Sequence, residues 1–98
     1  MNSVFSHLAS HIPLRKELKL RIEGNIGIVC SAHDFRVHYL NETALMIFNL
    51  IDGKRSIAEI ARRFLEMVDV ERAVFEPDLI EAIRNFQWQK LIVLKTNP

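Results

Sequence analysis

The sequence predicts an α+β fold in which a three-stranded antiparallel sheet is followed by three helices. Apolar and polar residues alternate at residues 17–23 and again at residues 35–39, a period of two that is typical of half-buried strands. From Asn41 onward the apolar residues recur every three or four positions, which is typical of amphipathic helices. The chain has 98 residues, which leaves room for one hydrophobic core.

Two strands are predicted at residues 17–23 and 26–31. In the first, the apolar side chains share one face, namely Leu18, Leu20 and Ile22. The second is rich in β-branched residues, which favour strands. Gly24 and Asn25 tolerate positive φ angles, so they predict a tight turn between the two strands.

A third strand is predicted at residues 35–39, after a short turn at residues 32–34. Its odd positions hold Phe35, Val37 and Tyr39, and its even positions hold Arg36 and His38. We expect the odd positions to face the core and the even positions to face outward. Short connections between the three strands imply an antiparallel meander.

Three helices follow. Asn41 is a favourable N-cap for the first, and Gly53 is placed to end it in a left-handed conformation. Ser56 and Glu59 form a capping box at the start of the second, whose inner positions are Ile57, Ile60, Ala61, Phe64 and Val68. The third is predicted to begin near Pro77, because proline suits the first helical position. Its inner face holds Leu79, Ile80, Ile83 and Phe86.

This content is that of a winged helix-turn-helix domain in which the sheet comes first. We expect the domain to span residues 17–98 and to follow an N-terminal arm at residues 1–16, which forms a short helix or stays loose. The apolar run at residues 91–94 is expected to form a small strand or to pack on the core.

Charge and cysteine content exclude several classes of protein. The chain carries 13 basic and 12 acidic residues, which argues against a strongly basic nucleic-acid binder. No apolar stretch is long enough to span a membrane. The single cysteine, Cys30, excludes a disulfide within the chain and a zinc site built on cysteine pairs. A reducing, cytoplasmic setting fits this composition.

No catalytic, cofactor or metal site is predicted. The sequence has no glycine-rich phosphate loop, nucleophile elbow or paired catalytic carboxylates, so we expect no enzymatic activity. His7 and His11 have the spacing of helical metal ligands, but no third ligand accompanies them. Cys30 is interpreted as a small buried apolar residue, because no histidine or acid is placed to activate it.

Three blocks of the sequence resemble the PqqD family. They are residues 39–44 (YLNETA), 47–53 (IFNLIDG) and 56–61 (SIAEIA). The order of strands and helices also matches the family's, so that the resemblance covers roughly residues 17–94. Two features depart from the family: Lys90 stands where a glycine is common, and residues 1–14 find no counterpart.

The resemblance implies a non-catalytic peptide chaperone. PqqD-like domains bind the leader of a ribosomally made precursor peptide and present it to a modifying enzyme, typically a radical-SAM enzyme. The leader joins the sheet as a strand beside the third strand, and its side chains enter a groove against the third helix. Carried onto this sequence, the expected peptide-binding residues are Phe35, Arg36, Val37, His38, Tyr39, Leu79, Ile83, Arg84, Phe86 and Gln87. We expect Arg84 to pair with an acidic leader residue.

Elementary physics supports strand addition at residues 35–39. An uncovered edge strand presents unpaired N–H and C=O groups, which are a template for an added strand. The same edge is also able to pair with a second copy of the chain.

Two alternatives stay open. The chain could be a DNA-binding winged helix protein, with residues 56–68 as recognition helix and its phosphate contacts at Lys54, Arg55, Arg62 and Arg63. Trp88 lies about 140° around the third helix from Ile83. It is therefore either a partner contact or packed against the N-terminal arm or the C-terminal run.

Overall fold

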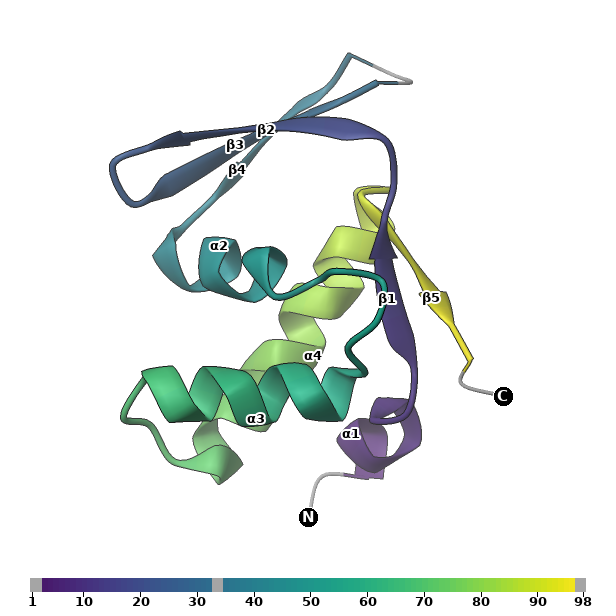
Figure 1. Ribbon diagram of the computed structural model, residues 1–98, viewed down its shortest axis with the longest axis vertical. Coiled ribbons are helices and arrows are strands. Elements are labelled where there is room, and N and C mark those ends of the chain that lie inside the picture. Colours follow the sequence, from purple (N-terminus) through teal and green to yellow (C-terminus); the bar gives the residue numbers. More distant parts are fainter. Residues whose placement is uncertain (1–2, 33–34, 97–98) are drawn as a thin grey trace.

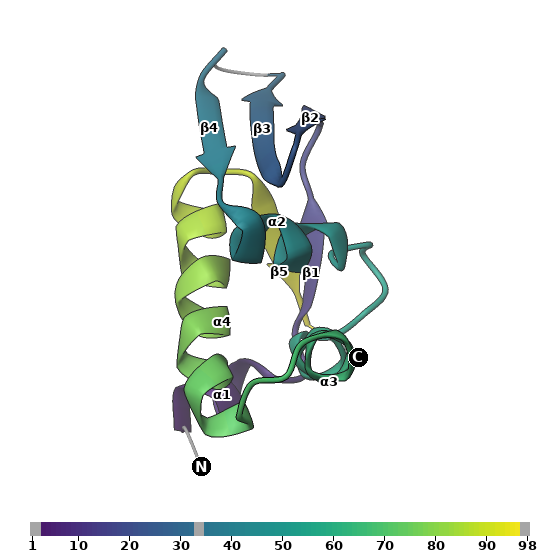
Figure 2. The ribbon, with the colours of Figure 1, turned by 90° about the vertical axis from the view of Figure 1, so that its left-hand side faces the viewer.

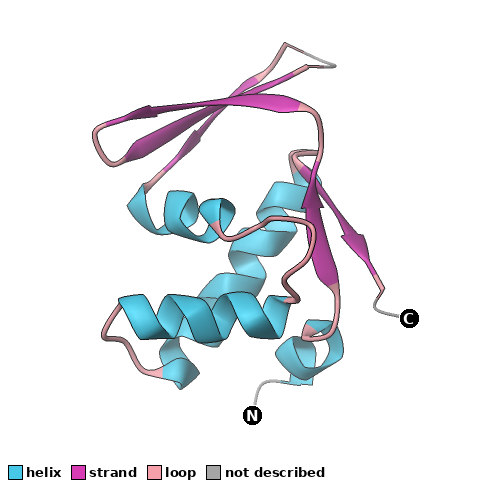
Figure 3. Cartoon of the chain, viewed as in Figure 1, coloured by secondary structure: helices cyan, strands magenta, loops and turns pink. Residues whose placement is uncertain are grey.

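A computed structural model describes residues 3–32 and 35–96 of the chain. The elements run in the order α1 (Ser3–Leu8), β1 (Ile12–Arg15), β2 (Leu18–Glu23), β3 (Ile26–Ser31), β4 (Val37–Leu40), α2 (Glu42–Asn49), α3 (Ile57–Met67), α4 (Arg72–Trp88) and β5 (Ile92–Lys95). The sheet of β2, β3 and β4 lies across α2, with α3 on the far side of α2 and α4 crossing behind both (Figure 1). The three-stranded sheet lies at one end of the molecule and β1 and β5 lie along one side, and α2, α3 and α4 lie below the first and beside the second (Figure 3). Within the described part of the chain, no helix is long and apolar enough to cross a membrane.

The predicted antiparallel meander is confirmed. Its strand order is β2-β3-β4, and each strand pairs with the next in sequence. Gly24 has a φ of +62° in the turn between β2 and β3, where a glycine avoids the strain of a left-handed residue. Gly27 is needed for a different reason: a Cβ there would lie 2.9 Å from Leu45 Cδ1. Glycine therefore allows α2 to pack closely under the sheet.

The predicted orientation of the third strand is wrong. Phe35 and Tyr39 are 85% and 72% exposed, whereas His38 is half-buried and Leu40 is buried. Leu40 packs in the core at the end of β4, and the alternation of a strand then turns Tyr39 outward. Phe35 has a φ of 57° and precedes β4, so it is not part of the strand. Residues 33 and 34 of the predicted turn lie outside the described residues.

Helix α2 begins as predicted, and Asn41 Oδ1 accepts a hydrogen bond from the Ala44 amide at 2.9 Å. The helix ends earlier than predicted, because Leu50 is its C-cap and Gly53 lies three residues further on. Gly53 does adopt a φ of +77°, but within the turn that leads to α3. The capping box of α3 is confirmed, with both reciprocal bonds between Ser56 and Glu59 formed.

Helix α4 begins five residues before the predicted start at Pro77. The earlier turn buries Phe75, whose ring stacks on that of Phe64 with centroids 4.1 Å apart. Pro77 has no N–H, so the helix lacks one backbone hydrogen bond at this point. Burial of Phe75 offsets that loss. A proline is therefore tolerated in the second turn here, and it does not mark the start of the helix.

The N-terminal segment is packed onto the rest of the fold. Strand β1 pairs antiparallel with β5, from Ile12 opposite Lys95 to Arg15 opposite Ile92. The apolar run at residues 91–94 thus contributes the small strand that was one of its two predicted outcomes. The carbonyls of Ala9 and His11 accept hydrogen bonds, each 2.9 Å long, from the first two amides of α3. These amides have no partner within a helix, so the segment satisfies them.

The core lies between the sheet, α2, α3 and α4. The predicted inner face of α4 is confirmed, since all four of its apolar residues are buried. Phe48 of α2 meets Phe86 of α4 edge to face, with ring centroids 5.3 Å apart. This contact sets the separation of α2 and α4, the two helices that form the site described next.

Candidate functional site

The outer edge of β4 has no strand partner among the described residues, because the sheet order ends there. The Ser31 amide donates to the Arg36 carbonyl at 3.2 Å. In an antiparallel pair, alternate residues bond to the neighbouring strand and the residues between them point away from it. His38 and Leu40 therefore bond to β3. Val37 and Tyr39 direct their N–H and C=O groups to the open edge.

The two open edges of this sheet differ in side-chain chemistry. Strand β2 carries three charged side chains at its edge, Lys19, Arg21 and Glu23, and the last two form an ion pair. Strand β4 carries neither a charged residue nor a proline. Charged edge residues discourage pairing with another strand, so β4 is the edge that is open to strand addition.

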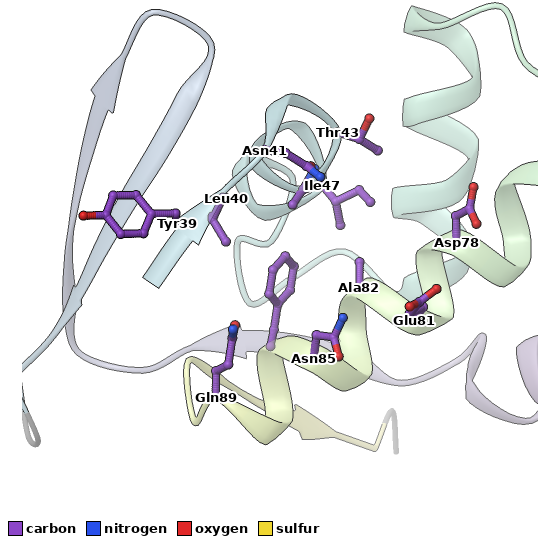
Figure 4. A pocket seen from close by; sticks show the side chains of 12 residues that line it. Tyr39, Leu40, Asn41, Thr43, Ile47, Asp78, Glu81, Ala82, Asn85 and Gln89 are labelled. Carbon is purple, nitrogen blue, oxygen red and sulfur yellow. The ribbon is translucent and has the colours of Figure 1, made fainter. Parts of the chain in front are cut away.

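A groove of about 440 Å³ begins beside β4. Its 12 lining residues come from two parts of the chain. One wall is the end of β4 with the start of α2, and contains Tyr39, Leu40, Asn41, Thr43, Ala44 and Ile47. The other wall is α4, and contains Asp78, Glu81, Ala82, Asn85, Phe86 and Gln89. Figure 4 shows Tyr39 and Gln89 at one end and Asp78 and Glu81 toward the other.

The polarity of the groove changes from floor to rim. The side chains of Leu40, Ile47 and Phe86 are 1–3% exposed and form an apolar floor. The other polar lining residues carry amide groups, at Asn41, Asn85 and Gln89, or hydroxyl groups, at Tyr39 and Thr43. Within residues 3–32 and 35–96, the charged residues that line the groove are Asp78 and Glu81. The groove is therefore apolar at its base and acidic at one end.

The five strand residues expected to bind peptide occupy different positions in the structure. Val37 and Tyr39 lie at the open edge, and Tyr39 also lines the groove. His38 faces inward, and its Nε2 is buried with no hydrogen-bond partner among the residues that the structure describes. Phe35 and Arg36 precede β4 and are exposed.

The five residues expected on the third helix also fall into different positions. Phe86 lines the groove. Leu79 and Ile83 are fully buried in the core, so they present no surface to a ligand. Arg84 and Gln87 are exposed, but neither lines the groove. The structure thus brings Phe86 together with Tyr39, and it separates the other four helix residues from the groove.

Sequence reasoning missed most of the α4 wall. Asp78, Glu81, Ala82, Asn85 and Gln89 follow the spacing i, i+3, i+4, i+7, i+11. This spacing places them on a single helical face. That face adjoins the apolar stripe used to predict the core. A second, mostly polar stripe of helical period was the signal that could have identified the groove.

Three further residues were candidates from the sequence for partner contacts or metal ligands. They are Trp88, His7 and His11. Trp88 is 88% exposed, so it does not pack against the N-terminal or C-terminal segments. The rings of His7 and His11 have centroids 6.4 Å apart. Among the described residues no group of three or more potential metal ligands occurs.

Two acidic groups outside the groove have shifted pKa values. The amides of Arg55 and Lys54 donate to Asp52, and they lower the pKa of its carboxyl group. The backbone amide of Ser56, followed by its hydroxyl, lowers the pKa of Glu59. Both groups stabilise the turn and the helix start between α2 and α3.

The family model described as coenzyme PQQ synthesis protein D (PqqD) matches residues 29–92. Curated relatives named PqqA binding protein occur in Xanthomonas oryzae pv. oryzae strains PXO99A and KACC10331 / KXO85. Each is 37% identical to this chain over 59 residues, which are 60% of this chain and 64% of the relative. The alignment therefore spans a little under two thirds of the relatives' length.

Two solved structures share the fold. One is described as TbiB1 in complex with the TbiA(beta) leader peptide; it has a TM-score of 0.73 and 15% identity, and the match covers 81% of this chain and 93% of that one. The other is described as lasso peptide synthetase B1 complexed with the leader peptide; it has a TM-score of 0.70 and 20% identity, and the match covers 87% and 99%. These two structures show the fold alone, and the family match over residues 29–92 shows that this chain belongs to the PqqD family.

Proposed function

We propose that this chain is a non-catalytic binding protein for the leader of a ribosomally made precursor peptide. The leader adds to the sheet as a strand beside β4, and some of its side chains enter the groove between α2 and α4. The chain then presents the bound precursor to a modifying enzyme of the radical-SAM class.

The observation that carries this proposal is the continuity of an open strand edge with a groove. Figure 2 shows β4 at one side of the sheet, directed toward α2 and lying above the C-terminal end of α4. A peptide strand gains its affinity from main-chain hydrogen bonds and its selectivity from side-chain pockets. Val37 and Tyr39 supply the main-chain hydrogen-bonding groups, and the groove that starts at Tyr39 supplies the side-chain pocket.

The comparisons support the same proposal. The curated relatives are named for binding PqqA, and the two solved structures of the same fold each hold a leader peptide. The radical-SAM partner rests on the family resemblance. A cytoplasmic location is part of the proposal, because a single cysteine fits a reducing compartment.

Peptide binding is tested by isothermal titration of the full chain with synthetic PqqA. The matched control is a scrambled PqqA of the same composition. We expect saturable binding of one PqqA per chain and no saturable binding of the scrambled form. Equal affinity for the two would contradict selective recognition.

The partner enzyme and self-association need separate measurements. Co-elution of the chain with a radical-SAM maturase that modifies the precursor, strengthened by precursor peptide, is the expected result. Failure to co-elute in the presence of saturating precursor would contradict presentation to that enzyme. If the β4 edge also pairs with a second copy, sedimentation will show a dimer that leader peptide dissociates.

The DNA-binding alternative gains no support from the cations around α3. Arg55 lies 3.5 Å from Asp52, and Arg63 lies 3.3 Å from Glu66, so two of the four cations already have acidic partners. A gel shift at low salt checks this directly. Specific, steeply salt-dependent binding of duplex DNA would favour the alternative.

A further inference from the structure

We propose that the acidic end of the groove selects leaders that carry a lysine or arginine a few residues beyond the segment paired with β4. This inference rests on the proposed function, and it specifies the chemistry of the ligand. It also reverses the prediction from sequence, in which Arg84 was to meet an acidic leader residue.

The charges of the lining residues all have one sign. Asp78 and Glu81 are exposed, and no lysine, arginine or histidine among the described residues lines the groove. Neither carboxylate takes part in an ion pair among the described residues, whereas Glu76 on the same helix is bonded to Arg72 at 3.3 Å. Two free carboxylates at one end of a groove favour a cationic ligand group and disfavour an anionic one.

The geometry fixes where that cation should occur in a leader. Gln89 and Tyr39 mark the end of the groove at the β4 edge, and Asp78 lies eleven residues back along α4 (Figure 4). Eleven residues of α-helix cover roughly 16 Å. An extended peptide covers this distance in about five residues. The basic residue is therefore expected about four or five positions from the residue that pairs with Tyr39.

The floor of the groove sets a second requirement on the same peptide. Leu40, Ile47 and Phe86 are apolar and lie between the strand edge and the carboxylates. A leader side chain that sits over this floor buries apolar surface, so an apolar residue is expected between the paired segment and the basic residue. The occupant is thus an extended peptide with an apolar residue followed or preceded by a cation.

The test is a position scan with synthetic PqqA variants in which lysine or glutamate replaces each residue in turn. Affinities for the full chain are measured by titration calorimetry. We expect one position, or two neighbouring ones, at which the lysine variant binds about two- to fivefold more tightly than the glutamate variant, since exposed ion pairs have modest energies. The preference should weaken as salt is raised.

Three protein variants assign this preference to the groove. Asp78→Asn/Glu81→Gln should remove it, and Asp78→Lys/Glu81→Lys should invert it. Glu66→Gln/Asp69→Asn is the control, because it removes the same charge from exposed residues that do not line the groove. This control should keep the preference at the wild-type value. All four mutated residues are exposed, and thermal melting confirms that each variant is folded.

The outcomes separate this inference from the proposed function. If wild-type protein binds PqqA but shows no position with a lysine preference, or if Asp78→Asn/Glu81→Gln keeps that preference, the acidic selectivity is overturned and peptide binding stands. If neither PqqA nor any scanned variant binds, both the inference and the proposed function are overturned.

Discussion

The amide of Ser31 donates to the carbonyl of Arg36 at 3.2 Å, and this contact sets the hydrogen-bond pattern of the strand that follows. In an antiparallel pair every second residue pair is hydrogen-bonded, so Val29 bonds to His38 and Gly27 bonds to Leu40. The backbone groups of Val37 and Tyr39 consequently face the open edge. The account of peptide binding given above depends on these two residues, and the first prediction addresses one of them.

Tyr39→Pro should weaken leader binding at least tenfold, about 1.4 kcal/mol. The substitution removes an outward N–H that an added strand would use, and proline is tolerated at a sheet edge because that N–H has no partner in the described part of the chain. Tyr39→Ala is the matched control, since it removes the side chain and keeps the N–H. Titration with synthetic PqqA measures both. Equal affinities for the proline and alanine variants would show that the Tyr39 amide is not used.

Ile83→Ala should lower the free energy of unfolding by about 2–5 kcal/mol, because Ile83 is fully buried and its truncation leaves a cavity. Val74→Ala on the same helix is the control, since Val74 is 55% exposed and should change stability by about 0.5 kcal/mol or less. Urea denaturation gives both values. Under conditions where Ile83→Ala is folded, its affinity for PqqA should match that of the wild type. A selective loss of affinity with unchanged stability would instead place Ile83 at the ligand.

Ser56→Ala should destabilise the protein by about 1 kcal/mol, because the Ser56 hydroxyl accepts a hydrogen bond from the Glu59 amide at 3.2 Å in the capping box. Ser10→Ala supplies the comparison, since Ser10 is exposed and outside α3. Thermal denaturation of the two variants separates a cap from an ordinary surface serine. Equal melting temperatures would show that the cap adds nothing to stability.

Acid should destabilise the fold partly through Asp52. The amides of Arg55 and Lys54 lower its pKa in the folded state below the ordinary value of 3.8. A lowered folded-state pKa means that the contribution is full above 3.8 and is lost as the pH falls through the folded-state value. Asp52→Asn keeps a side-chain oxygen for the two amides and removes the charge. Melting temperatures measured from neutral pH to about pH 3 should therefore fall less steeply for Asp52→Asn than for the wild type. Parallel curves would contradict this role of Asp52.

Much of the fold followed from local rules in the sequence. Alternation predicted β2, β-branched residues predicted β3, and the caps at Asn41 and Ser56 set the starts of α2 and α3. These features depend on neighbouring residues, so a single sequence contains them. The pairing of β1 with β5 joins segments about 80 residues apart, and strands of four residues are too short for a clear alternation. A single feature of the sequence indicated this pairing, which was the short apolar run at residues 91–94 after the last helix.

The orientation of β4 could not be predicted from local sequence rules. Alternation states that Tyr39 and Leu40 face opposite sides, but it does not state which side is the core. Two aromatic residues at odd positions favoured the wrong choice. The packing of Leu40 against α2 and β3 decides the matter, and this is a contact between elements. The groove could not be predicted from the sequence for the same reason. The polar stripe of α4 forms one wall of a groove only because α2 packs opposite it, and that is again a contact between elements.

The most direct test of the central claim is amide hydrogen exchange followed by NMR, with and without saturating synthetic PqqA. Strand addition at β4 predicts slower exchange at Val37 and Tyr39 when the peptide binds, and little change at His38 and Leu40, which already bond to β3. The Leu20 amide, which by the same alternation faces the open edge of β2, serves as the control and should not change. Unchanged exchange at Val37 and Tyr39 in the saturated complex would contradict strand addition at this edge.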